Sequence, residues 1–236
     1  MRWIIPLPLG LSAADVVALV LLALAWFGIG RLVERPPASR PSVSVLMKRY
    51  RREWMRQFLH RDPRIFDGNI LTTLREGTSF FASACMIALG GGMALIGNTD
   101  ALEGIARDLE AVEVPHLLWR IKLLLILLFV ANAFMKFVWA HRLFGYCAVM
   151  MAAVPNDPDD PRAMDRAMAA AEVNIHAARN FNMGLRAVYF ALGSAGWLAG
   201  PWGLMLGTVI VSAMTLRREF ASGSRQAILH DMGRDG

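Results

Sequence analysis

The sequence has few of the side chains from which metal and redox sites are built. It contains only two cysteines, Cys85 and Cys147, which lie in different stretches of the chain. Thiolate metal sites and disulfide frameworks need several cysteines at short or regular spacings. Neither is therefore expected, and the two thiols are predicted to be isolated and buried among apolar side chains.

Recognisable catalytic motifs are absent as well. The chain has no GxSxG, P-loop or HExxH sequence, which would supply an exposed nucleophile, a phosphate cradle or a pair of zinc ligands. None of its five histidines lies in the middle of an apolar stretch, where a haem between membrane helices would need its axial ligands. These absences predict a protein that is not an enzyme and that holds no metal or cofactor.

Long apolar stretches dominate what is present. Apolar residues make up 56 % of the 236, and four stretches are long, at about residues 11–33, 79–96, 117–140 and 185–216. A helix needs roughly 20 apolar residues to cross the hydrocarbon core of a bilayer, whereas a soluble domain would show one-sided or alternating patterns. The sequence therefore predicts an all-α, polytopic transmembrane helical bundle, with residues 1–236 forming one integral membrane domain.

The last apolar stretch is too long for one ordinary crossing. A helix over residues 185–216 would measure roughly 48 Å, against a core of about 30 Å. The sequence Gly200-Pro201-Trp202-Gly203 interrupts it, and proline and glycine favour a reversal there. We expect two short spans and hence five in all, at about 11–33, 76–97, 117–140, 185–200 and 203–217. If the last stretch crossed the membrane only once, the chain would have four spans. Trp197 and Trp202 are expected at the outer membrane interface, where indoles are favoured.

The positive charges predict the orientation. Eleven Lys and Arg lie between Arg31 and Arg75, whereas residues 98–116 hold one arginine and five acids. Because cytoplasmic connections are enriched in Lys and Arg, the first connection is expected inside and the second outside. The N-terminus is then periplasmic and the C-terminus cytoplasmic.

The polar connections contain amphipathic helices, which we expect on the cytoplasmic side. One covers Ser42–His60, with an apolar stripe through Leu46, Met47, Tyr50, Trp54 and Phe58 and a basic face of Lys48, Arg49, Arg51, Arg52 and Arg56. Such a helix suits the anionic surface of the cytoplasmic leaflet, although a partner protein or nucleic acid could be bound by a similar pattern. We favour lipid and expect no nucleic acid. A second helix follows Pro161, with a stripe of Met164, Met168, Ala171, Ile175 and Phe181.

A polar or anion site, or a site for a lipid head group, is predicted where the spans reach the cytoplasmic side. Lys136, with Asn132 one turn earlier, stands out as a charge inside an apolar stretch, and Glu76 enters the membrane at a similar level. Asn180, Asn182 and Arg186 are expected near them. The alternative is that Lys136 only snorkels to the interface.

The polar face of the second span is expected to turn toward the bundle. It consists of Asn69, Thr72, Glu76, Ser79 and Ser83.

Several blocks of the chain also carry a family resemblance. They read "RDPRIFDGNILTTL", "TSFFASACMIALGG", "FMKFVWAHRLFGYCAVMMAAVP", "ARNFNMGLRAVYFALGSAGWLAGP" and "LRREFASGSR". In this order they resemble an uncharacterised membrane family catalogued as domain of unknown function 599, common in proteobacteria and with relatives in plants. The resemblance covers about residues 42–225 and implies a protein of the bacterial inner (cytoplasmic) membrane. It supplies no activity, cofactor or catalytic residue.

Two functions remain open at this point. The first is an accessory or structural subunit, or scaffold, of a membrane assembly, acting with protein partners or as a homo-oligomer. The small connections and the glycine- and alanine-rich stretches favour it. The second is a small-solute or anion transporter or channel that acts as an oligomer, favoured by Lys136 and by the polar face of the second span.

Overall fold

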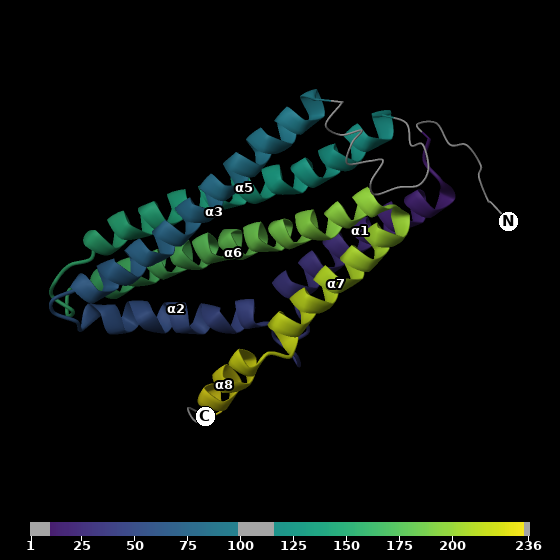
Figure 1. The fold of residues 1–236 in the computed structure, drawn as a ribbon. Coiled ribbons are helices and arrows are strands. Elements are labelled where there is room, and N and C mark those ends of the chain that lie inside the picture. Colours follow the sequence, from purple (N-terminus) through teal and green to yellow (C-terminus); the bar gives the residue numbers. More distant parts are fainter. Residues whose placement is uncertain (1–9, 99–115, 234–236) are drawn as a thin grey trace.

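A computed structural model describes residues 10–98 and 116–233, and every regular element in these ranges is helical (Figure 1). This confirms the all-α prediction. The elements are α1 (Ala13–Glu34), α2 (Val43–Leu59), α3 (Ile65–Gly97), α5 (His116–Ala152), α6 (Ala163–Ala195), the short 3-10 helix η1 (Gly196–Ala199), α7 (Pro201–Phe220) and α8 (Gly223–Met232).

Three of these helices, α1, α3 and α5, are long and apolar enough to cross a membrane. The start of α1 is fixed by a capping box, in which Ser12 and Asp15 bond to each other's backbone amides. Along α1 and α5, large apolar side chains such as Phe27 and Leu128 remain exposed, as expected for helices that face lipid. These helices are consistent with a membrane protein.

The long helices extend beyond the predicted spans. The helices α3, α5 and α6 begin or end at Ile65, Ala152 and Ala163, where hydropathy places span boundaries at residues 76, 140 and 185. At 33 residues, α3 and α6 are each about 50 Å long. Hydropathy detects only the apolar part of a helix, whereas helix–helix packing keeps the polar extensions helical.

The helix α6 lies at the centre and packs along α5 over much of its length (Figure 1). Its first half presents small side chains to its neighbours, and six of its alanines are buried: Ala163, Ala167, Ala170, Ala171, Ala177 and Ala178. Of the stripe predicted along this half, Ala171 and Ile175 are buried and Met168 packs against the core, whereas Met164 is exposed. Close helix packing here selects alanine and leaves the long methionine outside.

The predicted reversal after α6 is confirmed. Gly200 has φ 93°, a left-handed conformation that favours glycine, and Pro201 starts α7. The segments on either side of the reversal then touch backbone to backbone: a Cβ on Gly203 of α7 would lie 2.1 Å from the carbonyl oxygen of Gly196 in η1, and one on Gly207 would lie 2.2 Å from that of Gly193 in α6. The contacting glycines are thus paired across the reversal.

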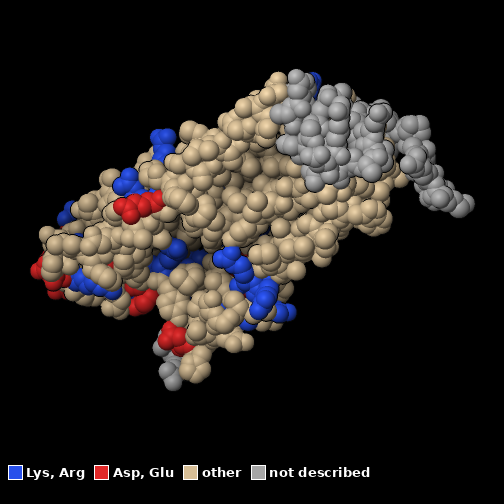
Figure 2. Space-filling view, viewed as in Figure 1, with Lys and Arg blue, Asp and Glu red and all other residues tan. Residues whose placement is uncertain are grey.

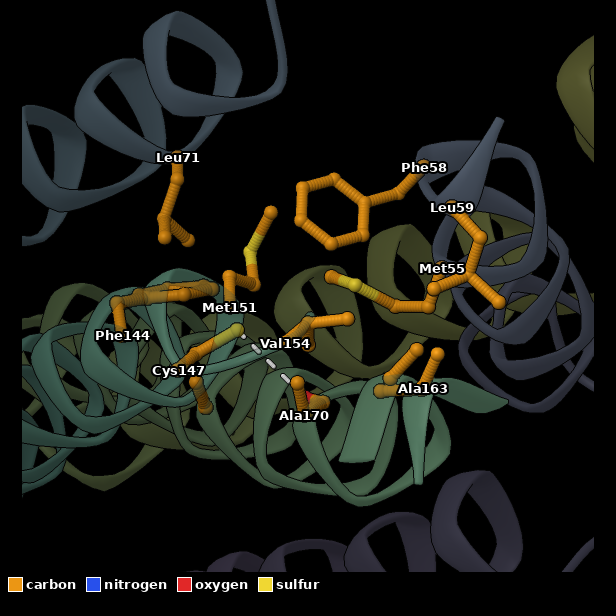
Figure 3. Packing of buried hydrophobic residues seen from close by; sticks show 13 residues of the cluster. Met55, Phe58, Leu59, Leu71, Phe144, Cys147, Met151, Val154, Ala163 and Ala170 are labelled. Atoms are coloured by element: carbon orange, nitrogen blue, oxygen red, sulfur yellow. Dashed lines mark hydrogen bonds between the residues drawn. The ribbon is translucent and has the colours of Figure 1, made fainter. Parts of the chain in front are cut away.

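The helix α2 lies against α6 at the end of the molecule opposite this reversal (Figure 1). Met55, Phe58 and Leu59 enter a core with residues of α3, α5 and α6, among them Phe144 and Met151 (Figure 3). The predicted apolar stripe is correct for Leu46 and Phe58 but misses Met55, which is fully buried, while Met47 and Tyr50 are only half-buried. The buried edge of α2 therefore contacts protein, and contact of the rest of the helix with anionic lipid stays a prediction.

Charged side chains are distributed unevenly over the molecule. On the face drawn in Figure 2, they gather over α2 and the neighbouring ends of the long helices, and near the end of α7, while most of the remaining described surface is uncharged. The charged side chains thus gather where α2 and the neighbouring helix ends lie, and the apolar spans carry few of them, which is typical of a membrane protein with a polar region outside the bilayer.

Candidate functional site

The structure separates Glu76 from Lys136, two residues of the predicted polar site. Contacts between Thr78 and His141, between Phe81 and Phe137, and between Gly92 and Leu127 set the antiparallel register of α3 and α5. This register places Glu76 about seven residues, or about 10 Å, beyond the level of Lys136. No hydrogen bond or ion pair joins the two within the described ranges, so their predicted proximity is wrong.

Two further predicted residues also stand apart. Asn132 is exposed on α5. The side chain of Asn180 donates a hydrogen bond of 2.9 Å to the His176 carbonyl oxygen on its own helix. Neither therefore contributes to a polar cluster.

The remaining two, Asn182 and Arg186, do belong to a polar cluster. They share one face of α6 with Ile175 and Arg179, at spacings of four, three and four residues. Arg186 Nη2 donates to Glu34 Oε1 at 3.0 Å, and Arg179 pairs with the other oxygen of the same carboxylate. The end of α1 is thereby fixed to the middle of α6.

A cavity of about 370 Å³ opens beside this cluster. Its walls come from the end of α1, the start of α2, the middle of α6, the end of α7 and the start of α8. We call it the five-helix cavity. Its charged and polar lining consists of Glu34, Ser44, Lys48, Arg51, Arg179, Asn182, Arg218, Glu219, Ser222 and Ser224.

Both acids of the cavity are held at its wall. Glu34 is paired with Arg179 and Arg186, as described. Glu219 accepts hydrogen bonds from Ser44, at 3.0 Å from its backbone nitrogen and 2.9 Å from its hydroxyl. The carboxylate of Glu219 thus lies at the N-terminus of α2, where the helix dipole favours a negative charge.

Three cations of the cavity have no carboxylate partner within the described residues. Arg51 donates to the neutral Asn174 side chain, and Arg218 donates to the Tyr189 hydroxyl, while Lys48 makes no hydrogen bond or ion pair there. Burial lowers the pKa of Arg51 from its ordinary value, because removing a cation from water disfavours the charged form. An arginine nevertheless stays protonated at neutral pH.

The basic face predicted for α2 is divided between different partners. Lys48 and Arg51 line the cavity, Arg52 Nε lies 2.6 Å from Glu172 Oε1 on α6, and Arg56 pairs with Glu53 on its own helix. Arg49 is exposed. Contact of this face with anionic lipid stays a prediction.

Above the cavity the bundle is filled by aromatic rings. Trp26 packs edge-on against Phe129 and Phe190, each with ring centroids 5.1 Å apart. Phe190 is fully buried. These three rings fill the space where α1, α5 and α6 meet.

The outer face of α3 is the second notable surface. Asn69, Thr72, Glu76, Ser79 and Ser83 are all exposed, so the prediction that this polar face turns into the bundle is wrong. The helix packs chiefly along α5, and the register places Glu76 on the polar extension, where water can solvate it. Farther along the same helix, a Cβ on Gly90 or Gly91 would meet no atom within 4 Å.

Sequence reasoning missed most of the cavity. Ser44 and Glu219 are 175 residues apart, and no local pattern links them. The sequence does contain one usable signal, a polar stripe at helical spacing that consists of Arg179, Asn182 and Arg186 and begins one turn after Ile175. Within the described residues, no group of three or more His, Cys, Asp or Glu is placed to hold a metal ion.

Comparison with known proteins places the chain in a family. The family described as "Protein of unknown function, DUF599" matches residues 17–224. No curated protein and no solved structure matches the chain. Because the match covers most of the sequence, the chain belongs to the DUF599 family of proteins of unknown function.

Proposed function

We propose that the chain is a non-enzymatic accessory or structural subunit of an assembly in the bacterial inner membrane. The observation that carries the proposal is the one-sided packing of α3. Of its most apolar 18 residues only 6 % are buried, compared with 33 % in α5. A helix that contacts one neighbour contributes little to the bundle of its own chain, and its free face is available to another membrane helix.

The composition of that free face supports a protein contact. Gly90 and Gly91 point into open space, whereas the adjacent Gly92 faces Leu127 of α5. Glycine lowers helix propensity by about 1 kcal/mol relative to alanine. In membranes, small residues let helix backbones approach closely, so two exposed glycines favour a partner helix, from another protein or a second copy.

The proposed topology has five spans, with a periplasmic N-terminus and a cytoplasmic C-terminus. The reversal at Gly200 supports two crossings by α6 and α7. The charged end that contains α2 would then lie in the cytoplasm, in agreement with the distribution of Lys and Arg.

A pair of glycine variants tests the subunit proposal. Gly91→Leu should disrupt the assembly, seen as a smaller particle and loss of co-purifying protein after mild extraction from the native membrane. Gly28→Leu is the matched control, because Gly28 on α1 is also exposed and a Cβ there would meet no atom within 4 Å. A native protein that runs as a lone monomer, or a Gly91→Leu variant that assembles normally, would contradict the proposal.

The alternative is an anion or small-solute transporter that acts as an oligomer. The cationic five-helix cavity favours it, but the packed rings of Trp26, Phe129 and Phe190 would oblige solute to pass along another route, such as the outer face of α3. Cysteines placed at Ser79 and Ser83 discriminate the two. Labelling by polar thiol reagents from both sides of the membrane favours the transporter, and protection favours the subunit.

A further inference from the structure

The five-helix cavity has the size and charge of a ligand site. Its volume of about 370 Å³ lies within the range of small-molecule pockets. Four basic and two acidic side chains line it, an excess of two positive charges. A concave site of this kind attracts an anion.

The arrangement of its acids leaves that positive charge available. Glu34 is paired with Arg179 and Arg186, and Glu219 with Ser44. These contacts hold both carboxylates at the wall. Three cations have no carboxylate in contact within the described residues. Arg51 and Arg218 bond to the neutral side chains of Asn174 and Tyr189, and Lys48 makes no hydrogen bond or ion pair there.

Neutral donors complete the lining. Ser222 and Ser224, at the start of α8, line the cavity and offer hydroxyl donors, whereas the Ser44 hydroxyl at the start of α2 already donates to Glu219. Both helices begin there, and helix N-termini carry partial positive charge. Guanidinium, ammonium and hydroxyl donors around one space match the several oxygens of a phosphate group.

The position of the cavity suggests where the phosphate comes from. It lies at the end of α1, a helix apolar enough to span a membrane, and the end of such a span is where head groups would meet it. We infer that the five-helix cavity binds a phosphate-type oxyanion, held by Lys48, Arg51 and Arg218. The phosphate is carried by the head group of an anionic phospholipid or by a small soluble phosphate ester.

The test measures thermal unfolding of the full chain in neutral detergent. One arm titrates inorganic phosphate against chloride at equal ionic strength. The other titrates dioctanoyl phosphatidylglycerol against dioctanoyl phosphatidylcholine. A saturable rise of the unfolding temperature with phosphate assigns the site to a soluble phosphate ester, and a rise with phosphatidylglycerol alone assigns it to a lipid head group.

Two variants show whether the binding takes place in the cavity. Lys48→Gln and Arg218→Gln should each weaken binding roughly tenfold or more, the loss expected for one charge-assisted hydrogen bond. Arg56→Gln, on α2 but paired only with Glu53, should change it less than about twofold. Lys48 is unpaired within the described residues, so its variant should fold normally. The proposal is overturned if neither probe raises the unfolding temperature, or if all three variants bind as the native chain does.

Discussion

Trp197 Nε1 donates a hydrogen bond of 2.7 Å to Asp15 Oδ1, across 182 residues of sequence. The bond joins the first turn of α1 to η1, at the reversal between α6 and α7. Both residues are buried, and the second oxygen of Asp15 accepts bonds from the backbone nitrogen and hydroxyl of Ser12, at 2.9 and 2.6 Å. The indole of Trp197 therefore lies inside the protein, and its level at the outer interface of the membrane stays a prediction.

The first prediction concerns this bond. Trp197→Phe keeps an aromatic ring but removes the donor, and it leaves a buried carboxylate oxygen without its partner. We expect a loss of about 1–3 kcal/mol in stability, measured as a lower unfolding temperature in detergent. Trp202→Phe is the control, because Trp202 is 75 % exposed. Equal unfolding temperatures for the two variants would show that the bond contributes nothing.

The second prediction concerns the glycine contacts of α6 and α7. Gly207→Ala would place a methyl group 2.2 Å from the Gly193 carbonyl oxygen, so the two helices would have to separate. Overpacking of this kind costs about 1–3 kcal/mol, and we expect a lower unfolding temperature and a lower yield of folded protein. Gly28→Ala, where the added methyl meets no atom within 4 Å, should fold at least as well as the native chain. A neutral Gly207→Ala variant would mean that the hairpin is looser than these contacts indicate.

The third prediction concerns the core that holds α2. Phe58 is 2 % exposed, and the Arg64 guanidinium lies 4.4 Å from its ring centroid. Phe58→Ala should destabilise the α2 contact by about 3–5 kcal/mol and expose the segment to protease, with cleavage between α1 and α3. The adjacent Gln57→Ala, on the exposed side of α2, should leave the cleavage rate unchanged. Equal resistance of both variants would argue that α2 is held by its ion pairs instead.

The apolar parts of the fold could be predicted because hydropathy depends on local composition. The spans in α1, α3 and α5 follow from this alone. The reversal at Gly200-Pro201 was also predictable, since these residue types limit the backbone locally. The polar extensions of the long helices have no such hydropathy signal, and in α6 the extension is stabilised by burial of alanines such as Ala167 and Ala170 against neighbouring helices.

The same distinction between local signals and tertiary packing applies to the candidate site. Asn182 and Arg186 could be placed near one another because they share a face of one helix. Glu76 and Lys136 lie on different helices, and their relative level depends on the register of α3 and α5, which the sequence does not state. The pairing of Ser44 with Glu219 depends on five helices meeting at one end of the bundle. Such a contact follows from tertiary packing and has no local signal.

The last prediction concerns the ion pair between Glu34 and Arg186. The Arg186 side chain is 7 % exposed, so Glu34→Gln would leave a buried cation without its counter-charge. Removing one partner of a buried pair costs about 3–5 kcal/mol, and we expect a marked fall in the unfolding temperature. Glu76→Gln is the matched control, because Glu76 is exposed and its variant should unfold as the native chain does.

A second substitution separates the loss of the pair from general damage to α1. Arg186→Met in the Glu34→Gln background removes the stranded cation and replaces it with an apolar side chain of similar length, which is often tolerated or stabilising at a buried ion pair. The double variant should recover part of the lost stability, and a double-mutant cycle measures the coupling. If the double variant is as unstable as the sum of the two single changes, Glu34 acts on the fold through Arg179 or through α1 itself, and not through Arg186.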